Sequence, residues 1–185
     1  MPEPVSTTIF FSHSSKDAVW VEHLRQQALA SGVEVYLAEH DVSPGVLLSD
    51  KVRAQIERSD AMLVLLTQNS WQSAYVQQEI GLALQAKKLV IPIVTPDAAH
   101  LDRGLLVGVE YILLEPEAPQ EALAKLSASL THFVRRRDEE AAHQASVERV
   151  ATLEQAAAAR RQTQLMIAGL VVVFGLVVLA GSPSA

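Results

Sequence analysis

Residues 61–66 read AMLVLL, six apolar residues with no polar side chain among them. A strand that faces solvent on one side alternates apolar and polar residues, so an unbroken apolar run predicts a strand covered on both faces. Residues 89–94, LVIPIV, form a second run of the same kind. Such runs are typical of parallel sheets in which helices cover both faces, and they predict that class of fold here.

Strand and helix patterns alternate on both sides of these two runs. The remaining strand patterns lie at residues 7–11, 33–37 and 111–114. Apolar residues at helical spacing predict helices over residues 17–30, 46–58, 73–87 and 119–134. The alternation predicts an α/β domain with five parallel strands in one sheet and helices on both of its faces.

Ligands of such sheets bind beyond the carboxyl ends of the strands, in the loops that lead into the helices. Three of these loops, residues 12–16, 40–45 and 67–71, hold polar and aromatic side chains. Because parallel strands end at the same edge of a sheet, we expect the three loops to converge. The sequence therefore predicts a functional site at this edge.

Glu79 is the candidate catalytic residue. It follows Trp71 by eight residues and Tyr75 by four, and residues four apart share one face of a helix. If residues 70–79 form a single helix, two aromatic rings lie in line with one carboxylate, which suits a site that holds a planar ring and stabilises a cation. The alternative is that both rings pack in the core, which is the commoner role of aromatic residues at this spacing.

Composition narrows the classes of function. The chain has 185 residues and a net charge of −6, so it has no broad positive field to attract the phosphates of a nucleic acid. It has no cysteine, which excludes disulfides, metal–thiolate sites and thiol catalysis. The six histidines show no metal-ligand spacing, and the usual phosphate-binding glycine motifs are missing. We expect no metal, no bound cofactor and no nucleic-acid partner.

Two further segments follow the predicted domain. Residues 135–164 are rich in Ala, Glu, Gln and Arg and hold no Gly or Pro, which predicts a helical stalk. Residues 165–181 are 17 residues without a charge, about 26 Å long as a helix, and predict a single transmembrane helix rather than a buried core helix. Arg160 and Arg161 precede this run, so the positive-inside rule predicts a membrane-anchored chain whose N-terminal domain is cytoplasmic.

Several of these segments resemble the motifs of TIR domains. Residues 10–17, FFSHSSKD, are similar to the family's first box, and residues 41–45 resemble its BB loop. Residues 69–71, NSW, together with the segment 75–79, resemble the bacterial stretch that carries the catalytic glutamate. Residues 91–93, IPI, match the family's fourth strand. The chain departs from many relatives at Tyr75, where they have Trp.

The resemblance covers residues 7–134 and implies a flavodoxin-like fold. It implies either an NAD nucleosidase, for which NAD is the substrate, or an adaptor that associates with other copies of itself. In the enzyme Glu79 would be catalytic, and Trp71 and Tyr75 would bound the nicotinamide or the sugar.

The loop after the first strand completes the site that the resemblance implies. Ser12, His13 and Ser14 would reach the pyrophosphate of NAD near a helix N-terminus. Ser14 also has a plain structural interpretation, because Ser14-x-x-Asp17 has the spacing of a helix capping box.

The chemistry of NAD favours the enzyme. An ordinary O-glycoside usually needs two carboxyl groups, because the leaving oxygen must be protonated. The nicotinamide of NAD is already a cation and leaves as a neutral molecule, so one carboxylate, that of Glu79, is enough to stabilise the developing charge. We therefore expect a membrane-anchored NAD glycohydrolase or cyclase of a bacterial antiviral or stress defence, activated by homo-oligomerisation through TIR contacts. The alternatives are a non-catalytic adaptor at the membrane and a pore-forming effector.

Overall fold

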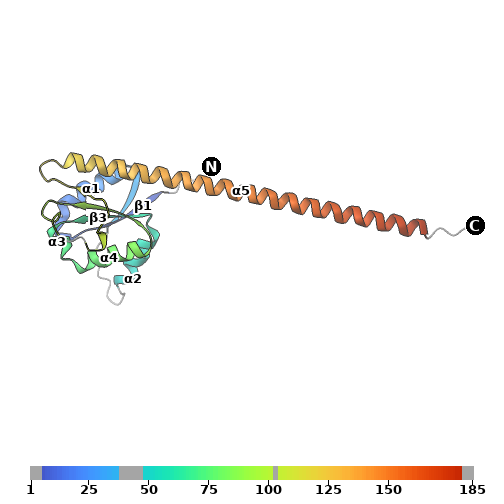
Figure 1. Ribbon diagram of the computed structural model, residues 1–185, viewed down its shortest axis with the longest axis horizontal. Helices are drawn as coiled ribbons and strands as arrows, with labels where there is room; N and C mark the ends of the chain where they lie inside the picture. Colours follow the sequence, from blue (N-terminus) through green and yellow to red (C-terminus); the bar gives the residue numbers. More distant parts are fainter. Residues whose placement is uncertain (1–5, 38–47, 102–103, 181–185) are drawn as a thin grey trace, which may run out of the picture. The chain divides into compact units, whose positions relative to one another are not determined.

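The computed structural model describes residues 6–37, 48–101 and 104–180, without the side chains of residues 48–49 and 168–180. Five strands form one parallel sheet in the order β2-β1-β3-β4-β5 (Figure 1). The strands are β1 (Thr7–Ser12), β2 (Val33–Leu37), β3 (Ala61–Leu66), β4 (Leu89–Val94) and β5 (Ile112–Leu113). The five-stranded parallel sheet expected from the apolar runs is therefore confirmed.

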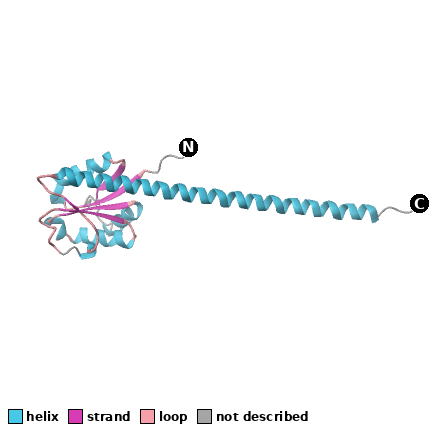
Figure 2. Cartoon of the chain, turned by 45° about the horizontal axis from the view of Figure 1, so that its top comes forward, coloured by secondary structure: helices cyan, strands magenta, loops and turns pink. Residues whose placement is uncertain are grey.

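Helices connect successive strands and cover both sides of the sheet (Figure 2). The described α-helices are α1 (Ala18–Ala30), α2 (Leu48–Arg58), α3 (Gln68–Trp71), α4 (Ala74–Gln85) and α5 (Pro119–Ala180). Two short 3-10 helices, η1 (Ser15–Asp17) and η2 (Gly104–Leu106), precede α1 and β5. Apolar residues of α1 and of the first turns of α5 cover one face of the sheet, and those of α2 and α4 cover the other.

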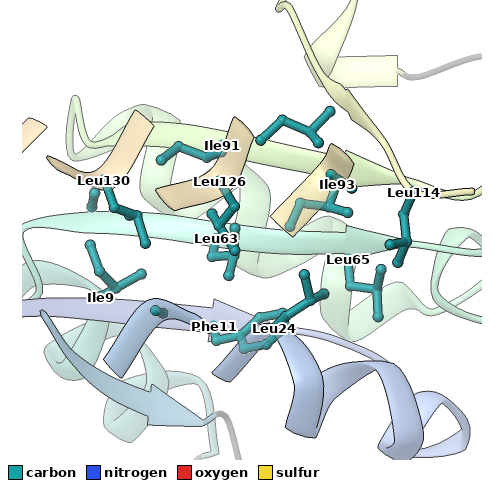
Figure 3. Close-up of a cluster of buried hydrophobic side chains, with 14 of the residues drawn as sticks. Ile9, Phe11, Leu24, Leu63, Leu65, Ile91, Ile93, Leu114, Leu126 and Leu130 are labelled. Atoms are coloured by element: carbon teal, nitrogen blue, oxygen red, sulfur yellow. The ribbon is translucent and has the colours of Figure 1, made fainter. Parts of the chain in front are cut away.

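Strand β3 lies at the centre of the sheet, and all six of its residues are buried. Leu63 and Leu65 point to the face where Leu24 of α1 and Leu126 and Leu130 of α5 pack (Figure 3). The alternate residues of β3 pack with α2 and α4 on the opposite face. Burial on both faces explains why the sequence of this strand has no polar alternation.

The helix predicted over residues 73–87 is observed as α4, Ala74–Gln85. The aligned arrangement of Trp71, Tyr75 and Glu79 required one helix over residues 70–79, and this condition is not met, because α3 ends at Trp71 and α4 begins at Ala74. Side chains at both starts bond to the backbone: Thr67 accepts from the N–H groups of two α3 residues, and Ser73 accepts from Val76 N. These caps fix two separate helix N-termini, so the 3.6-residue period does not run through the segment.

The chain divides into two compact units, residues 1–135 and 136–185. The second unit consists largely of the later turns of α5. The segment 135–164, predicted as a helical stalk, is helical throughout as part of α5. Among the residues whose side chains are described, no helix has a stretch long and apolar enough to cross a membrane. The apolar run 165–181 lies almost wholly outside that set, and so does the loop 41–45 that resembles the BB loop.

Candidate active site

Glu79 and Ser12 meet at the carboxyl end of strand β1. Ser12 is the last residue of the strand and is fully buried, and Glu79 lies on α4 with 4% of its surface exposed. The Ser12 hydroxyl donates a hydrogen bond of 2.5 Å to Glu79 Oε2. The two residues are 67 positions apart in the sequence, so the fold itself brings them together.

Burial changes the acid strength of the Glu79 carboxyl. Desolvation raises its pKa from 4.5 to about 7, because the charged form loses contact with water. The hydrogen bond from Ser12 acts in the opposite direction and lowers the pKa, because it stabilises the carboxylate. A buried carboxyl that titrates near neutral pH is typical of functional sites.

Of the two aromatic residues, only Tyr75 keeps the expected helical spacing to Glu79, because both lie on α4, whereas Trp71 lies on the separate helix α3. Trp71 is the last residue of α3, half-buried against the apolar cluster that includes Phe10 and Leu106. A Cβ on Gly104 would lie 3.9 Å from the Trp71 ring, so the tryptophan sits beside η2. Tyr75 lies in the first turn of α4 and is 54% exposed.

The other predicted residues of the β1–α1 loop make local contacts. The ring of His13 packs at a tilt against Phe11, with ring centroids 5.5 Å apart. Ser14 is the N-cap of η1 and accepts a hydrogen bond of 3.3 Å from Lys16 N, so the expected capping role of Ser14 is confirmed. The side chain of Asp17 does not close the capping box, because it bonds elsewhere.

Asp17 forms a buried polar cluster that the sequence did not reveal. Its carboxylate accepts hydrogen bonds from Thr67 Oγ1 at 2.7 Å and from Asn69 Nδ2 at 2.9 Å. The contact joins the loop after β1 to the loop after β3. A signal was present, because neighbouring parallel strands end side by side and both loops carry polar residues.

The described residues contain no cluster of three or more His, Cys, Asp or Glu side chains able to hold a metal ion. The third expected site loop, residues 40–45, lies outside the described part of the chain. The site as described therefore consists of the buried Glu79 carboxyl, its partner Ser12, and the loops after β1 and β3, which Asp17 joins.

Comparison with solved structures shows the same fold in proteins with several functions. The TIR domain of the Toll-related receptor TRR-2 from Hydra magnipapillata is 16% identical, with a TM-score of 0.55 over 69% of this chain and 97% of that one. The Clostridium botulinum CMP N-glycosidase BcmB is 21% identical, with a TM-score of 0.50 over 66% and 99%. A diflavin flavoprotein A3 from Nostoc sp. is 14% identical, with a TM-score of 0.54 over 74% and 98%.

At these identities the structural likeness shows the fold alone. No protein of curated function matches the sequence. Residues 9–127, more than half of the chain, match the family model described as TIR domain. The sheet order, the loops at its carboxyl edge and this match agree, and the chain belongs to the TIR domain family.

Proposed function

We propose that this protein is an enzyme that cleaves the bond between nicotinamide and ribose in NAD, with Glu79 as the catalytic residue. The observation that carries the proposal is the buried Glu79 carboxyl, bonded to Ser12 at the carboxyl end of β1. Open α/β sheets bind ligands at this edge. Burying a carboxylate without a positive charge beside it costs free energy, so a buried Glu79 at this edge favours a ligand that brings a positive charge.

The reaction needs only one carboxylate. The C–N bond breaks with both electrons passing to the ring nitrogen, so the pyridinium leaves as neutral nicotinamide. Positive charge develops on the ribose carbon, and ionised Glu79 stabilises it electrostatically in a site shielded from water. A water molecule, or a nucleophile within the substrate, then adds to that carbon and loses a proton.

The pKa of Glu79 couples substrate binding to ionisation. With a pKa of about 7, a large share of the free enzyme is protonated at neutral pH. The fixed positive charge of NAD's nicotinamide ring favours the ionised carboxylate when the ring lies beside it. Binding of NAD therefore lowers the pKa of Glu79 and releases a proton from the protonated fraction.

The remaining site residues would position the substrate. We assign Trp71 and Tyr75 to the nicotinamide or sugar side, and the loop residues Ser12, His13 and Ser14 to the pyrophosphate side. Cleavage of an N-glycosidic bond is also the activity named for the CMP N-glycosidase that has this fold. That likeness supports the class of reaction without identifying the substrate of this chain.

We also propose that residues 165–181 anchor the protein in a membrane, with the TIR domain on the cytoplasmic side. The sequence supports this through an uncharged run of 17 residues preceded by Arg160 and Arg161. Anchoring in a surface raises the local concentration of TIR domains. Contacts between copies would then activate NAD cleavage, as suits a defence response.

The test is nicotinamide release from NAD by the full chain in detergent micelles. We expect the Glu79→Gln variant, which keeps the shape and can still accept from Ser12, to lose activity by about 100-fold or more. Gln78→Ala, an exposed neighbour on the same helix, serves as the matched control. Equal release by Glu79→Gln and the wild type would refute the assignment, and no release by the wild type at any density would favour the adaptor.

A further inference from the structure

We propose that Asp17 is a positioning residue for this reaction: through Thr67 and Asn69 it holds α3, and with it Trp71, in register with the Ser12–Glu79 pair. The kinetic part of the inference rests on the proposed function, whereas its structural part does not. Asp17 acts through other side chains and is not assigned a contact with the substrate.

Both carboxylate oxygens of Asp17 are used in contacts that cross between loops. The residue is 7% exposed at the end of η1. Oδ2 accepts from Thr67 Oγ1, 50 residues away, and Oδ1 accepts from Asn69 Nδ2, 52 residues away. A buried carboxylate that accepts two charge-assisted hydrogen bonds, one on each oxygen, fixes both the position and the orientation of its donors.

The bond to Asp17 determines how Thr67 caps α3. A threonine hydroxyl has one proton to donate and two lone pairs that accept. Because the proton goes to Asp17, the lone pairs accept from Asn69 N at 3.1 Å and Ser70 N at 3.2 Å. The Thr67 N–H donates in turn to Ser70 Oγ at 2.7 Å, which completes a capping box. Loss of Asp17 frees the hydroxyl to turn away from this geometry.

Trp71 depends on the same cap because α3 is only four residues long. Its backbone N–H donates to Thr67 O at 2.9 Å. A helix this short has almost no internal stability and keeps its place through its caps and its packing. The position of the Trp71 ring beside Gly104 therefore follows from the position of Thr67.

Covalent and hydrogen-bonded links form a closed loop that includes Ser12, Asp17, Thr67 and Glu79. From Ser12 the chain runs five residues to Asp17, which bonds across to Thr67. From there α3 leads through the bond between Ser73 N and Ser70 O, 3.0 Å long, into α4. Helix α4 carries Glu79 back to Ser12. A closed circuit of bonds limits small shifts of the catalytic group, and shifts of about 1 Å can cost ~100-fold in rate.

The competing explanation is that Asp17 merely anchors a loop and adds stability. Asp60 offers a matched control, because it is also an aspartate that bonds across the β1–β3 pair. Its Oδ2 accepts from Thr8 N at 2.9 Å, at the amino ends of β1 and β3, which is the end of the strands opposite to the site. Asp60→Ala should lower stability without touching the site.

The kinetic experiment compares nicotinamide release per folded molecule for the full-length variants. We expect Asp17→Ala and Thr67→Val each to lower kcat by about tenfold or more. The loss in the double variant should be smaller than the product of the two single losses, because both variants remove the bond between Asp17 and Thr67. Asp17→Asn, which keeps an acceptor for Thr67, should recover most of the rate. Asp60→Ala should stay within about twofold of the wild type. Equal rates for Asp17→Ala and Asp60→Ala would overturn the inference.

A second measurement needs no activity. The chain has two tryptophans, so in a Trp20→Phe background the emission reports on Trp71 alone. We expect Asp17→Ala, and the milder Asn69→Ala at an exposed position, to increase acrylamide quenching of Trp71, and Asp60→Ala to leave it unchanged. If the wild type releases no nicotinamide, the proposed function fails while quenching still decides the linkage. Unchanged quenching in both variants overturns the linkage even if the enzyme is active.

Discussion

At the scale of single residues, the pKa of Glu79 makes the stability of the fold depend on pH. The folded pKa of about 7 lies above the ordinary value of 4.5, so the folded state binds the proton more tightly than the unfolded chain does. The stabilisation from this proton is complete below pH 4.5, declines as the pH rises towards 7, and is absent above that. The shift corresponds to ~3 kcal/mol at most.

Glu79→Gln removes this titration and keeps the side chain's shape. We expect the free energy of unfolding of the variant, relative to the wild type, to increase by up to ~3 kcal/mol between pH 4.5 and pH 8. Urea unfolding at the two pH values measures the difference. A difference that is the same at both values would show that the Glu79 carboxyl is not desolvated in the folded protein.

Ser12 controls the same group from the other side. Its hydroxyl lowers the pKa of Glu79, so Ser12→Ala should raise that pKa further above 7. If Glu79 must be ionised for catalysis, the rising limb of kcat/KM moves to higher pH in this variant. The deficit of Ser12→Ala relative to the wild type should then be larger at pH 6 than at pH 9. A deficit that does not change with pH would mean that Ser12 acts only by packing.

At the scale of elements, the sequence predicts best those strands that are buried on both faces. All six residues of β3 are buried, so all six are apolar, and this unbroken run identifies the strand. Strand β5 is an edge strand of two residues, Ile112–Leu113, and the expected four-residue pattern is longer than its pairing with β4. The sequence pattern predicts whether a strand is buried, but it does not predict where an edge strand stops pairing with its neighbour.

Helix α3 shows why part of the site was missed. Its four residues are too few for any period, and it exists because Thr67 and Ser70 bond to the backbone. Serine and threonine fit loops, caps and strands alike, so their presence after β3 does not predict a helix. The bond from Thr67 to Asp17 depends on side-chain directions that only the packed loops define. The sequence predicted that Ser12 and Glu79 belong to one site, because the loops after parallel strands converge at one edge, but it did not predict the hydrogen bond between them.

The two-sided burial of β3 leads to a prediction about stability. Leu63 is fully buried between helices and sheet, so Leu63→Ala should lower the free energy of unfolding by ~2–5 kcal/mol. Leu89, the first residue of the neighbouring strand β4, is 46% exposed, and Leu89→Ala should cost less than ~1.5 kcal/mol. Denaturant unfolding of both variants compares them. Similar losses would contradict the placement of β3 at the centre of the sheet.

At the scale of the whole molecule, the chain combines a TIR domain with a long helical segment whose sequence ends in an apolar run. Residues 1–135 form a unit with their own core, and Ser12, Asp17 and Glu79 all lie within it. The proposed roles of the later residues are to locate the domain and to bring copies together. Location and chemistry are then separable by truncation.

A fragment of residues 1–164 and the full chain should therefore differ in membrane binding and in rate, but not in the site. We expect the full chain to float with phospholipid vesicles and the fragment to remain in solution. Changing Val172 and Leu176 together to Asp places two charges in the run, each of which costs about 3 kcal/mol on insertion, and should release the full chain from the vesicles.

With equal amounts of protein, nicotinamide release by the full chain should rise with its density on vesicles, whereas release by the fragment should not respond to vesicles. Flotation of the fragment would place the membrane contact elsewhere, and a rate per molecule independent of surface density would separate anchoring from activation.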